Sequence, residues 1–243
     1  MTTPEPRTTP SGARLLAVPD ANAAASLTAT LLHDAITTAL GERGGARVAL
    51  SGGRTPLAAY AQLGPAVRDW SEVTVLLADE RCVPQDHPDS NAREIRAALG
   101  PAARDLRLVP LVENGSPGDR ARAYAHDLGP EPIDVVLLGL GEDGHTASLF
   151  PAHGALEAEG RTVAVLDAPK PPPERVSLTL PELRTAGSVV LLVTGAGKAD
   201  ALARTLGEPG QAAPASLLRP ETLTVVADAD ALRRADELGL TGA

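Results

Sequence analysis

The chain has 243 residues, with 22 Lys or Arg and 31 Asp or Glu, so its formal net charge is −9. This length suits a single large domain, and a composition of 43% apolar and 22% charged residues is typical of a folded globular protein. The acidic balance argues against a general nucleic-acid binder, which needs a basic surface to contact phosphates. No apolar run approaches the roughly 18 residues of a membrane-spanning helix, and a single cysteine excludes an intrachain disulfide. We therefore expect a cytoplasmic protein without a nucleic-acid or membrane partner.

The first residues are rich in proline and hydroxyl side chains and lack the apolar stretch of a signal peptide. We expect residues 1–12 to form a flexible tail and residues 13–243 to form a single α/β domain.

Short apolar runs alternate with longer helical patterns along this domain. The predicted strands span residues 14–18, 47–50, 73–78, 133–138, 162–166, 175–180, 188–194 and 223–227. The predicted helices span residues 21–40, 56–63, 91–99, 117–128, 198–206 and 229–237. Continuously apolar strands indicate a sheet that is covered on both faces. The alternation predicts a doubly wound, mostly parallel α/β sheet with helices on both faces, in which ligands bind beyond the carboxyl ends of the strands.

The first candidate site follows the strand at residues 47–50. The string SGGRTP over residues 51–56 places two glycines between a strand and a helix. Such a turn brings backbone N–H groups close to a ligand, which suits a phosphate. A simple strand-to-helix turn with a Thr cap is an equal alternative for this motif alone.

A second segment carries charged and polar groups to the same edge of the sheet. Asp79 and Arg81 follow the strand at residues 73–78, and Asn91 opens the next predicted helix. The Arg81 guanidinium offers a planar fork to a phosphate or carboxylate. The alternative is an arginine that pairs with its acidic neighbours on a solvated loop.

A third segment, GLGEDGHTASLFP over residues 139–151, follows another apolar strand. It contains the pattern G-x-G-x-x-G, but a dinucleotide site needs a helix that opens at the third glycine. Here His145 follows that glycine and Pro151 would interrupt the helix, so we reject this interpretation. We expect a glycine-rich loop that presents His145 at the edge of the sheet. A lone histidine is usually structural or exposed, but one held by glycines after a buried strand is a candidate general base.

A fourth segment, TGAGK over residues 194–198, lacks the hydroxyl residue that a P-loop requires after its lysine. Lys198 is nevertheless a cation near a helix start, although an ordinary exposed helix residue is the simpler explanation for it alone. The other four histidines show no metal-ligand spacing, and we interpret them as structural or exposed.

Taken together, these strings resemble the 6-phosphogluconolactonase family. The matching strings are residues 51–56, 79–81 with 83–84 and 90–91, 139–151, 175–181, and 194–198. The chain departs from the family at Cys82, where a large aromatic is common, and at Ser177, where Thr is frequent. The resemblance implies a Rossmann-like sheet and hydrolysis of 6-phospho-D-glucono-1,5-lactone to 6-phospho-D-gluconate in the oxidative pentose phosphate pathway. It implies no cofactor, no metal and no obligatory protein partner.

The resemblance also assigns roles to residues of the four segments. His145 is the catalytic base and Asp143 orients the loop or the imidazole. The residues expected to bind the substrate or its phosphate are Ser51, Gly52, Gly53, Arg54, Thr55, Asp79, Arg81, Asn91, Gly141, Arg175 and Lys198. Two alternatives are an amino-sugar-phosphate deaminase/isomerase and a non-catalytic sugar-phosphate-binding module. The deaminase string continues HIAFNEP, whereas HTASLFP here lacks its Glu, and the first twelve residues leave no room for a DNA-binding helix-turn-helix.

Overall fold

The computed structural model describes residues 4–242, which fold around an eight-stranded sheet. The strand order is β1-β2-β11-β10-β7-β3-β4-β6, and all neighbours are parallel except β1 and β2. These strands are β1 (Arg7–Thr8), β2 (Arg14–Val18), β3 (Ala46–Leu50), β4 (Val73–Leu77), β6 (Arg107–Leu108), β7 (Val135–Gly139), β10 (Ser188–Val193) and β11 (Leu223–Asp228). The predicted doubly wound, mostly parallel sheet is confirmed.

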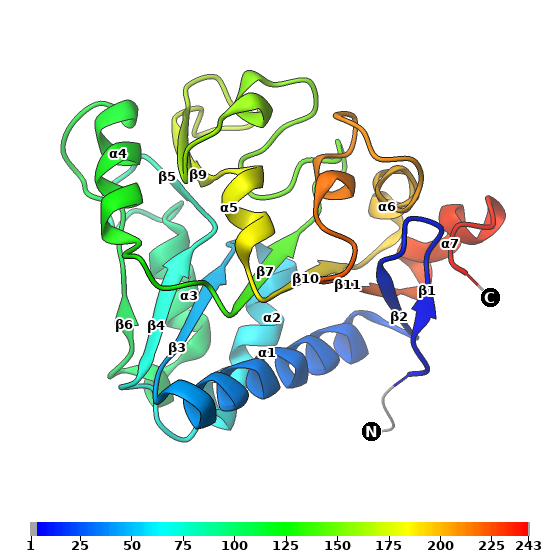
Figure 1. The fold of residues 1–243 in the computed structure, drawn as a ribbon, viewed down its shortest axis with the longest axis horizontal. Coiled ribbons are helices and arrows are strands. Elements are labelled where there is room, and N and C mark those ends of the chain that lie inside the picture. Colours follow the sequence, from blue (N-terminus) through cyan, green and yellow to red (C-terminus); the bar gives the residue numbers. More distant parts are fainter. Residues whose placement is uncertain (1–3, 243) are drawn as a thin grey trace.

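Helices cover both faces of this sheet. They are α1 (Ala21–Arg43), α2 (Arg54–Ala66), α3 (Asn91–Leu99), α4 (Pro117–Asp127), α5 (Leu180–Thr185), α6 (Ala199–Leu206) and α7 (Ala229–Glu237). Short 3-10 turns are η1 (Pro101–Ala103), η2 (Gly154–Glu157), η3 (Ala196–Lys198) and η4 (Pro214–Leu217). Figure 1 shows α1 along the lower side of the sheet, where it packs against α2, with α5 and α6 above the sheet. Asp20 caps α1 by accepting from the N–H of Ala23.

A second, smaller sheet is a correction to the prediction. The strands β8 (Thr162–Val165) and β9 (Arg175–Leu178) do not join the main sheet but pair antiparallel, and β9 also pairs with β5 (Asp79–Arg81). The predicted strand over 175–180 ends early because Thr179 accepts from the N–H of Glu182 and caps α5. This small sheet lies above β3 and β4 in Figure 1.

The segment expected to be a flexible tail is in part ordered. Arg7–Thr8 pairs with β2, and the buried side chain of Thr9 exchanges hydrogen bonds with the backbone of Ala13. The prediction of a loose tail is therefore wrong from Arg7 onward, because this segment extends the edge of the main sheet. Residues 1–3 lie outside the described part of the chain.

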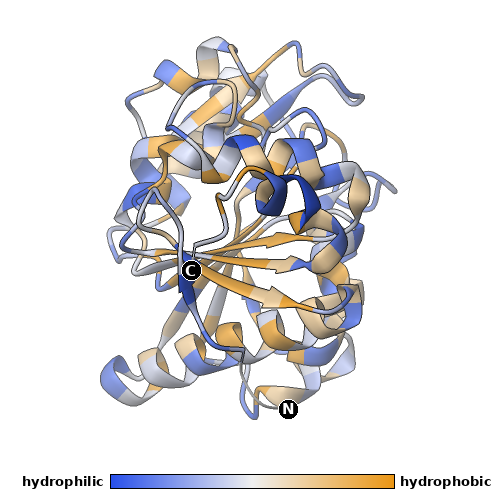
Figure 2. Ribbon diagram, turned by 90° about the vertical axis from the view of Figure 1, so that its right-hand side faces the viewer, coloured by the Kyte–Doolittle hydropathy of each residue, from blue (hydrophilic) through white to orange (hydrophobic). Residues whose placement is uncertain are grey.

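The core is built mainly from Ala, Val and Leu. Figure 2 shows the strands of the main sheet coloured as hydrophobic, between helices whose hydrophobic and hydrophilic residues alternate. Two large buried aromatics, Tyr60 in α2 and Trp70 shortly after it, have their polar atoms paired with backbone carbonyls. The Tyr60 hydroxyl donates to the carbonyl of Ser51 at 2.8 Å, and Trp70 Nε1 donates to the carbonyl of Gly64 at 3.0 Å. Tyr60 thereby fixes the end of β3 from inside the protein.

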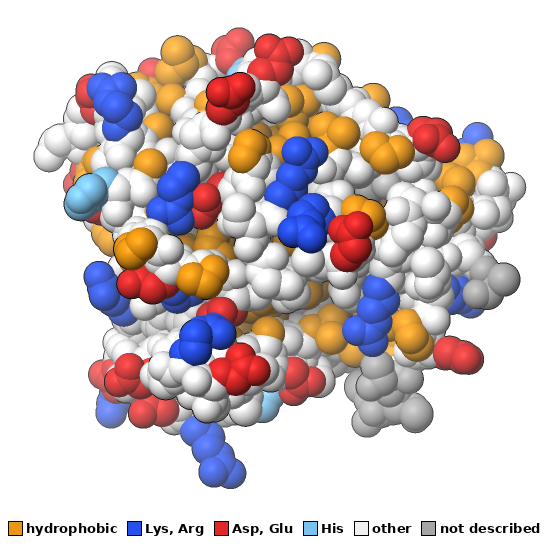
Figure 3. All heavy atoms as spheres, viewed as in Figure 1, with side chains coloured by type: hydrophobic (Ala, Val, Ile, Leu, Met, Phe, Trp, Pro, Cys, Tyr) orange, Lys and Arg blue, Asp and Glu red, His pale blue; other side chains and the backbone are white. Residues whose placement is uncertain are grey.

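On the face that Figure 3 shows, basic and acidic side chains are interspersed rather than separated into patches of one sign. No helix among the described residues is long and apolar enough to cross a membrane.

Candidate active site

A cavity of about 490 Å³ opens at the carboxyl ends of β10, β7, β3 and β4, which are neighbours in the main sheet. The chain order reverses between β7 and β3, and such a switch point is where doubly wound sheets bind their ligands. Of the residues predicted to act in catalysis or binding, all line this cavity except Asp143. The lining includes Ser51, Gly52, Gly53, Arg54, Thr55, Asp79, Arg81, Asn91, Gly141, His145, Arg175 and Lys198.

The turn from β3 into α2 forms one wall of the cavity. Gly53 has φ +100° and caps α2 without a side-chain hydrogen bond, so the Thr cap considered from the sequence is wrong. A Cβ atom on Gly52 would lie 1.9 Å from Asn91 Oδ1, so only glycine fits there. The N–H groups of the first turn of α2 are therefore available at the cavity, as an anion requires.

Asp79 and Asn91 form the wall beside this turn. Both are buried, and Asn91 Nδ2 donates to the backbone carbonyl of Asp79 at 2.8 Å and to its Oδ1 at 3.2 Å. The Ser148 hydroxyl donates to Asp79 Oδ2 at 2.6 Å. Asp79 thus ties β5 to α3 and to the histidine loop.

Three polar atoms of the cavity residues are buried and make no hydrogen bond to any described residue. They are Ser51 Oγ, Asn91 Oδ1 and Arg81 Nε. Buried polar atoms are nearly always paired with protein, water or ligand. These three atoms belong to residues that line one cavity, and this favours a polar, oxygen-rich ligand there.

His145 and Asp143 form a close pair on the loop that follows β7. His145 Nδ1 lies 2.5 Å from Asp143 Oδ1, which also accepts the His145 backbone N–H at 3.2 Å. A Cβ atom on Gly141 would lie 2.1 Å from His145 Nδ1 and 2.3 Å from Asp143 Oδ1, so glycine is required beside the pair. Because Nδ1 faces the carboxylate, it carries the proton, and Nε2 is the ring nitrogen left to accept one.

The surroundings shift the pKa values of both His145 and Asp143. Burial lowers the pKa of His145 below its usual value, although the Asp143 carboxylate opposes this. Burial raises the pKa of Asp143, but the His145 ring outweighs it and leaves that pKa below the usual value. The ring of His145 also packs on Phe150, with centroids 4.7 Å apart. The lowered pKa favours the neutral imidazole, and Asp143 and Phe150 hold the ring in one orientation.

Five cations line the cavity, namely Arg54, Arg81, Lys170, Arg175 and Lys198. Burial lowers the pKa of Lys198, while Glu142 opposes this shift. Arg175 is buried, with Nε and Nη2 donating to the carbonyls of Pro172 at 3.0 Å and Lys170 at 2.8 Å. Much of the Arg175 guanidinium is thus engaged by the chain itself.

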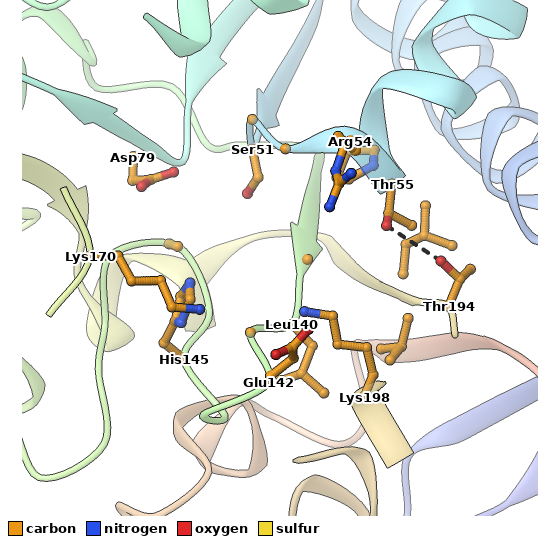
Figure 4. Close-up of a pocket in the computed structure, with 18 of the residues that line it drawn as sticks. Ser51, Arg54, Thr55, Asp79, Leu140, Glu142, His145, Lys170, Thr194 and Lys198 are labelled. Atoms are coloured by element: carbon orange, nitrogen blue, oxygen red, sulfur yellow. Dashed lines mark hydrogen bonds between the residues drawn. The ribbon is translucent and has the colours of Figure 1, made fainter. Parts of the chain in front are cut away.

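Figure 4 shows that different side chains line the two ends of the cavity. His145, Lys170 and Asp79 lie at one end, on the left of the picture. Arg54, Thr55, Thr194, Glu142 and Lys198 lie at the other end, on the right. The Thr55 and Thr194 hydroxyls are 3.4 Å apart and join the start of α2 to the end of β10.

Sequence reasoning missed several lining residues, among them Lys170, Glu142 and Thr194. Glu142 and Thr194 lie within the glycine-rich strings at residues 139–151 and 194–198. Lys170 lies in a proline-rich segment that resembles an ordinary surface loop. One signal was available, because Lys170 and Lys198 are the only lysines in the chain.

A family model described as "Glucosamine-6-phosphate isomerases/6-phosphogluconolactonase" matches residues 19–227. The 6-phosphogluconolactonase of Pseudomonas putida is 43% identical over 194 residues, which cover 75% of this chain and 80% of that protein. The 6-phosphogluconolactonase of Rattus norvegicus is 39% identical over 216 residues, covering 82% and 83%. A crystal structure of a 6-phosphogluconolactonase from Shewanella baltica superposes with a TM-score of 0.81 at 29% identity, covering 88% of this chain and 97% of that one.

Proposed function

The chain belongs to the glucosamine-6-phosphate isomerase/6-phosphogluconolactonase family, and on this premise we propose that it hydrolyses 6-phospho-D-glucono-1,5-lactone with His145 as the general base. The product is 6-phospho-D-gluconate, and the reaction belongs to the oxidative pentose phosphate pathway. Relatives at 34–43% identity carry the name 6-phosphogluconolactonase over most of the chain, which supports the reaction.

The observation that carries the proposed mechanism is the His145–Asp143 pair at the cavity edge. His145 Nε2 removes a proton from water as the water oxygen attacks C1 of the lactone. The carbonyl becomes an oxyanion, and its collapse breaks the bond between C1 and the ring oxygen. The imidazolium returns the proton to that ring oxygen, so His145 ends the cycle neutral. Asp143 fixes the tautomer of the ring and stabilises the imidazolium between the two steps.

The other end of the cavity suits the 6-phosphate. We assign it to the backbone N–H groups of residues 51–55, with Arg54 and Lys198 as counter-charges. Ser51 Oγ, Asn91 Oδ1 and Arg81 Nε are unpaired buried atoms of residues that line the cavity, and they suit the hydroxyl groups of the sugar. Arg81 also donates through Nη1 to the carbonyl of Asp89 at 2.7 Å, which fixes its guanidinium.

The proposed reaction requires no cofactor, because a lactone is an activated ester that water attacks directly. We further propose that the protein works in the cytoplasm without an obligatory protein partner. Its single cysteine, Cys82, is a free thiol in the structure, which suits a reducing compartment.

The direct test is hydrolysis of freshly generated 6-phosphogluconolactone, coupled to oxidation of the product, with spontaneous hydrolysis subtracted. Glucosamine 6-phosphate serves as the second substrate. The proposed function predicts rapid turnover of the lactone and none of the amino sugar. Turnover of the amino sugar alone would support the deaminase alternative, and tight product binding without turnover would support a non-catalytic module.

A further inference from the structure

Lysine is confined to the cavity in this chain. Of 22 basic residues, only Lys170 and Lys198 are lysines, and both line the cavity. Arginine serves every other cationic position, on the surface and in the ion pairs. An ammonium is a compact point charge that can meet a single oxygen atom, whereas a guanidinium is a planar fork suited to two. The distribution indicates that the cavity needs ammonium groups where the rest of the protein does not.

Lys170 lies at the end of the cavity that holds the general base. In Figure 4 its side chain reaches down toward His145, at the end opposite Arg54 and Lys198. The charge of Lys170 lowers the pKa of His145, although this effect is smaller than those of burial, Asp143 and Asp79. The phosphate end has its own cations and N–H groups, so Lys170 is not needed there.

The backbone that carries Lys170 is fastened at several points although the loop is exposed. Buried Arg175 donates to the carbonyls of Lys170 at 2.8 Å and Pro172 at 3.0 Å. The Ala168 N–H donates to the carbonyl of Pro173 at 3.0 Å. The Arg175 guanidinium carbon in turn lies 5.6 Å from the ring centroid of Phe150, the ring on which His145 packs. The same residues thus position the base and the ammonium relative to each other.

We propose that Lys170 is a catalytic residue whose Nζ donates a hydrogen bond to the C1 carbonyl oxygen of the lactone. This inference rests on the proposed lactonase function. The hydrogen bond strengthens as water adds and the carbonyl oxygen becomes negatively charged. When the oxyanion collapses and the ring C–O bond breaks, that oxygen becomes part of the product carboxyl group and Lys170 remains an ammonium. A group that meets developing charge raises kcat rather than substrate affinity.

The test compares Lys170→Met with the wild-type protein on the phosphorylated lactone and on unphosphorylated gluconolactone. Methionine keeps most of the length of the side chain and removes the charge. We expect kcat to fall by about 10²–10³-fold on both lactones, the loss typical for one oxyanion donor, with KM for the phosphorylated lactone nearly unchanged. A kcat equal to that of the wild type would overturn the proposal. A defect confined to KM of the phosphorylated lactone would overturn it too, because Lys170 would then be a phosphate ligand.

Chemical rescue separates the ammonium from any structural effect of the substitution. In a Cys82→Ser background, Lys170→Cys is alkylated with 2-bromoethylamine, so that the thiolate displaces bromide and a thioether places an amine where Nζ was. We expect this treatment to restore most of kcat, whereas iodoacetamide, which leaves a neutral group, restores none. Complete alkylation of a folded protein without recovery contradicts the proposal. If the wild-type protein does not hydrolyse the lactone, both the proposed function and the proposed role of Lys170 are contradicted. If the wild type and the Lys170→Met variant are equally active, only the role of Lys170 is contradicted.

Discussion

At the scale of single residues, the proposed chemistry depends on a histidine, His145, whose position is set by its neighbours. Asp143 fixes one ring nitrogen, Phe150 supports the ring face, and Gly141 leaves room for both side chains of the pair. Each of these contacts is local, because all four residues lie within one loop. Changes here should therefore alter turnover far more than stability.

Replacement of His145 tests the base itself. We expect His145→Gln to lose about 10²–10⁴-fold in kcat, the usual contribution of a general base, while it binds 6-phosphogluconate nearly as well as the wild type. Retention of more than about a tenth of wild-type turnover by a folded variant would contradict the assignment.

The pH profile supplies a second readout for the same residue. Only neutral imidazole accepts a proton, and burial lowers the pKa of His145, so kcat/KM of the wild type should stay high to a pH below the usual histidine value of about 6.5. The substrate phosphate also ionises near pH 6, and unphosphorylated gluconolactone serves as the control because it lacks that group. On unphosphorylated gluconolactone, His145→Gln should lose the fall in kcat/KM at acid pH that protonation of His145 causes in the wild type.

A methyl group at residue 141 should displace the pair without unfolding the protein. In Gly141→Ala the new Cβ would overlap His145 Nδ1 and Asp143 Oδ1, so these side chains must move. We expect a fall in kcat of at least about tenfold, because small misplacements of reacting groups are costly, with a nearly unchanged melting temperature. Gly154→Ala is the matched control, since its Cβ meets nothing within 4 Å. Equal kcat in the two variants would show that the pair does not need its present geometry.

At the scale of elements, a buried carboxylate joins the small sheet to the start of α3. Glu80 accepts the backbone N–H groups of Arg81, Asn91 and Ala92 at 2.7–2.8 Å and the Ser90 hydroxyl at 3.1 Å. Burial raises the pKa of Glu80, although the three N–H groups oppose this shift. Glu80 thereby fixes β5 against α3, and with it the neighbouring cavity residues.

Removal of this carboxylate should destabilise the protein. Glu80→Ala leaves three buried or half-buried N–H groups without their acceptor. Each unsatisfied group lowers the free energy of unfolding by about 1–3 kcal/mol. We expect the free energy of unfolding, measured by urea titration, to fall by at least about 3 kcal/mol. Glu42→Ala on the exposed side of α1 is the control, with an expected change within about 0.5 kcal/mol. Equal stability of the two variants would show that the network around Glu80 contributes little.

At the scale of the whole molecule, an acidic protein concentrates positive charge in one cavity. The net charge is −9, yet five cations line this cavity. Arg54, Arg81 and Lys198 follow neighbouring parallel strands, whose carboxyl ends share one edge, whereas Lys170 and Arg175 come from the small antiparallel sheet and the loop before β9. We therefore expect phosphate recognition at one end of the cavity and the general base at the other.

This division predicts a defect that depends on the substrate phosphate. Lys198→Met removes one charge from the phosphate end and should raise KM for the phosphorylated lactone by about 10- to 150-fold, the value of one charge-assisted hydrogen bond. Unphosphorylated gluconolactone is the control, and its KM and kcat should stay near the wild-type values. An equal loss on both lactones would place Lys198 at the carbonyl instead.

The local pattern of the sequence determined most of the elements. The strand at residues 14–18 and the helices at residues 91–99 and 229–237 match their predicted bounds. Apolar runs, helix caps and prolines act over a few neighbouring residues, which is why they can be interpreted without the fold. The glycine-rich loop with His145 was predictable for the same reason, since its glycines, its histidine and Pro151 are contiguous.

Only the tertiary structure decided which strands pair and which side chains meet. The sequence predicts a tail at Arg7–Thr8, but in the structure this segment pairs with β2. The sequence likewise predicts β8 and β9 as strands of the main sheet, but they form a separate sheet in which β9 pairs with β5 and β8. Lys170 lies 25 residues beyond His145 in the sequence, in a loop without regular structure. Its place in the cavity depends on Arg175, which holds the loop by its backbone carbonyls. Contacts between distant segments arise from the packing of the whole chain, and no local pattern encodes them.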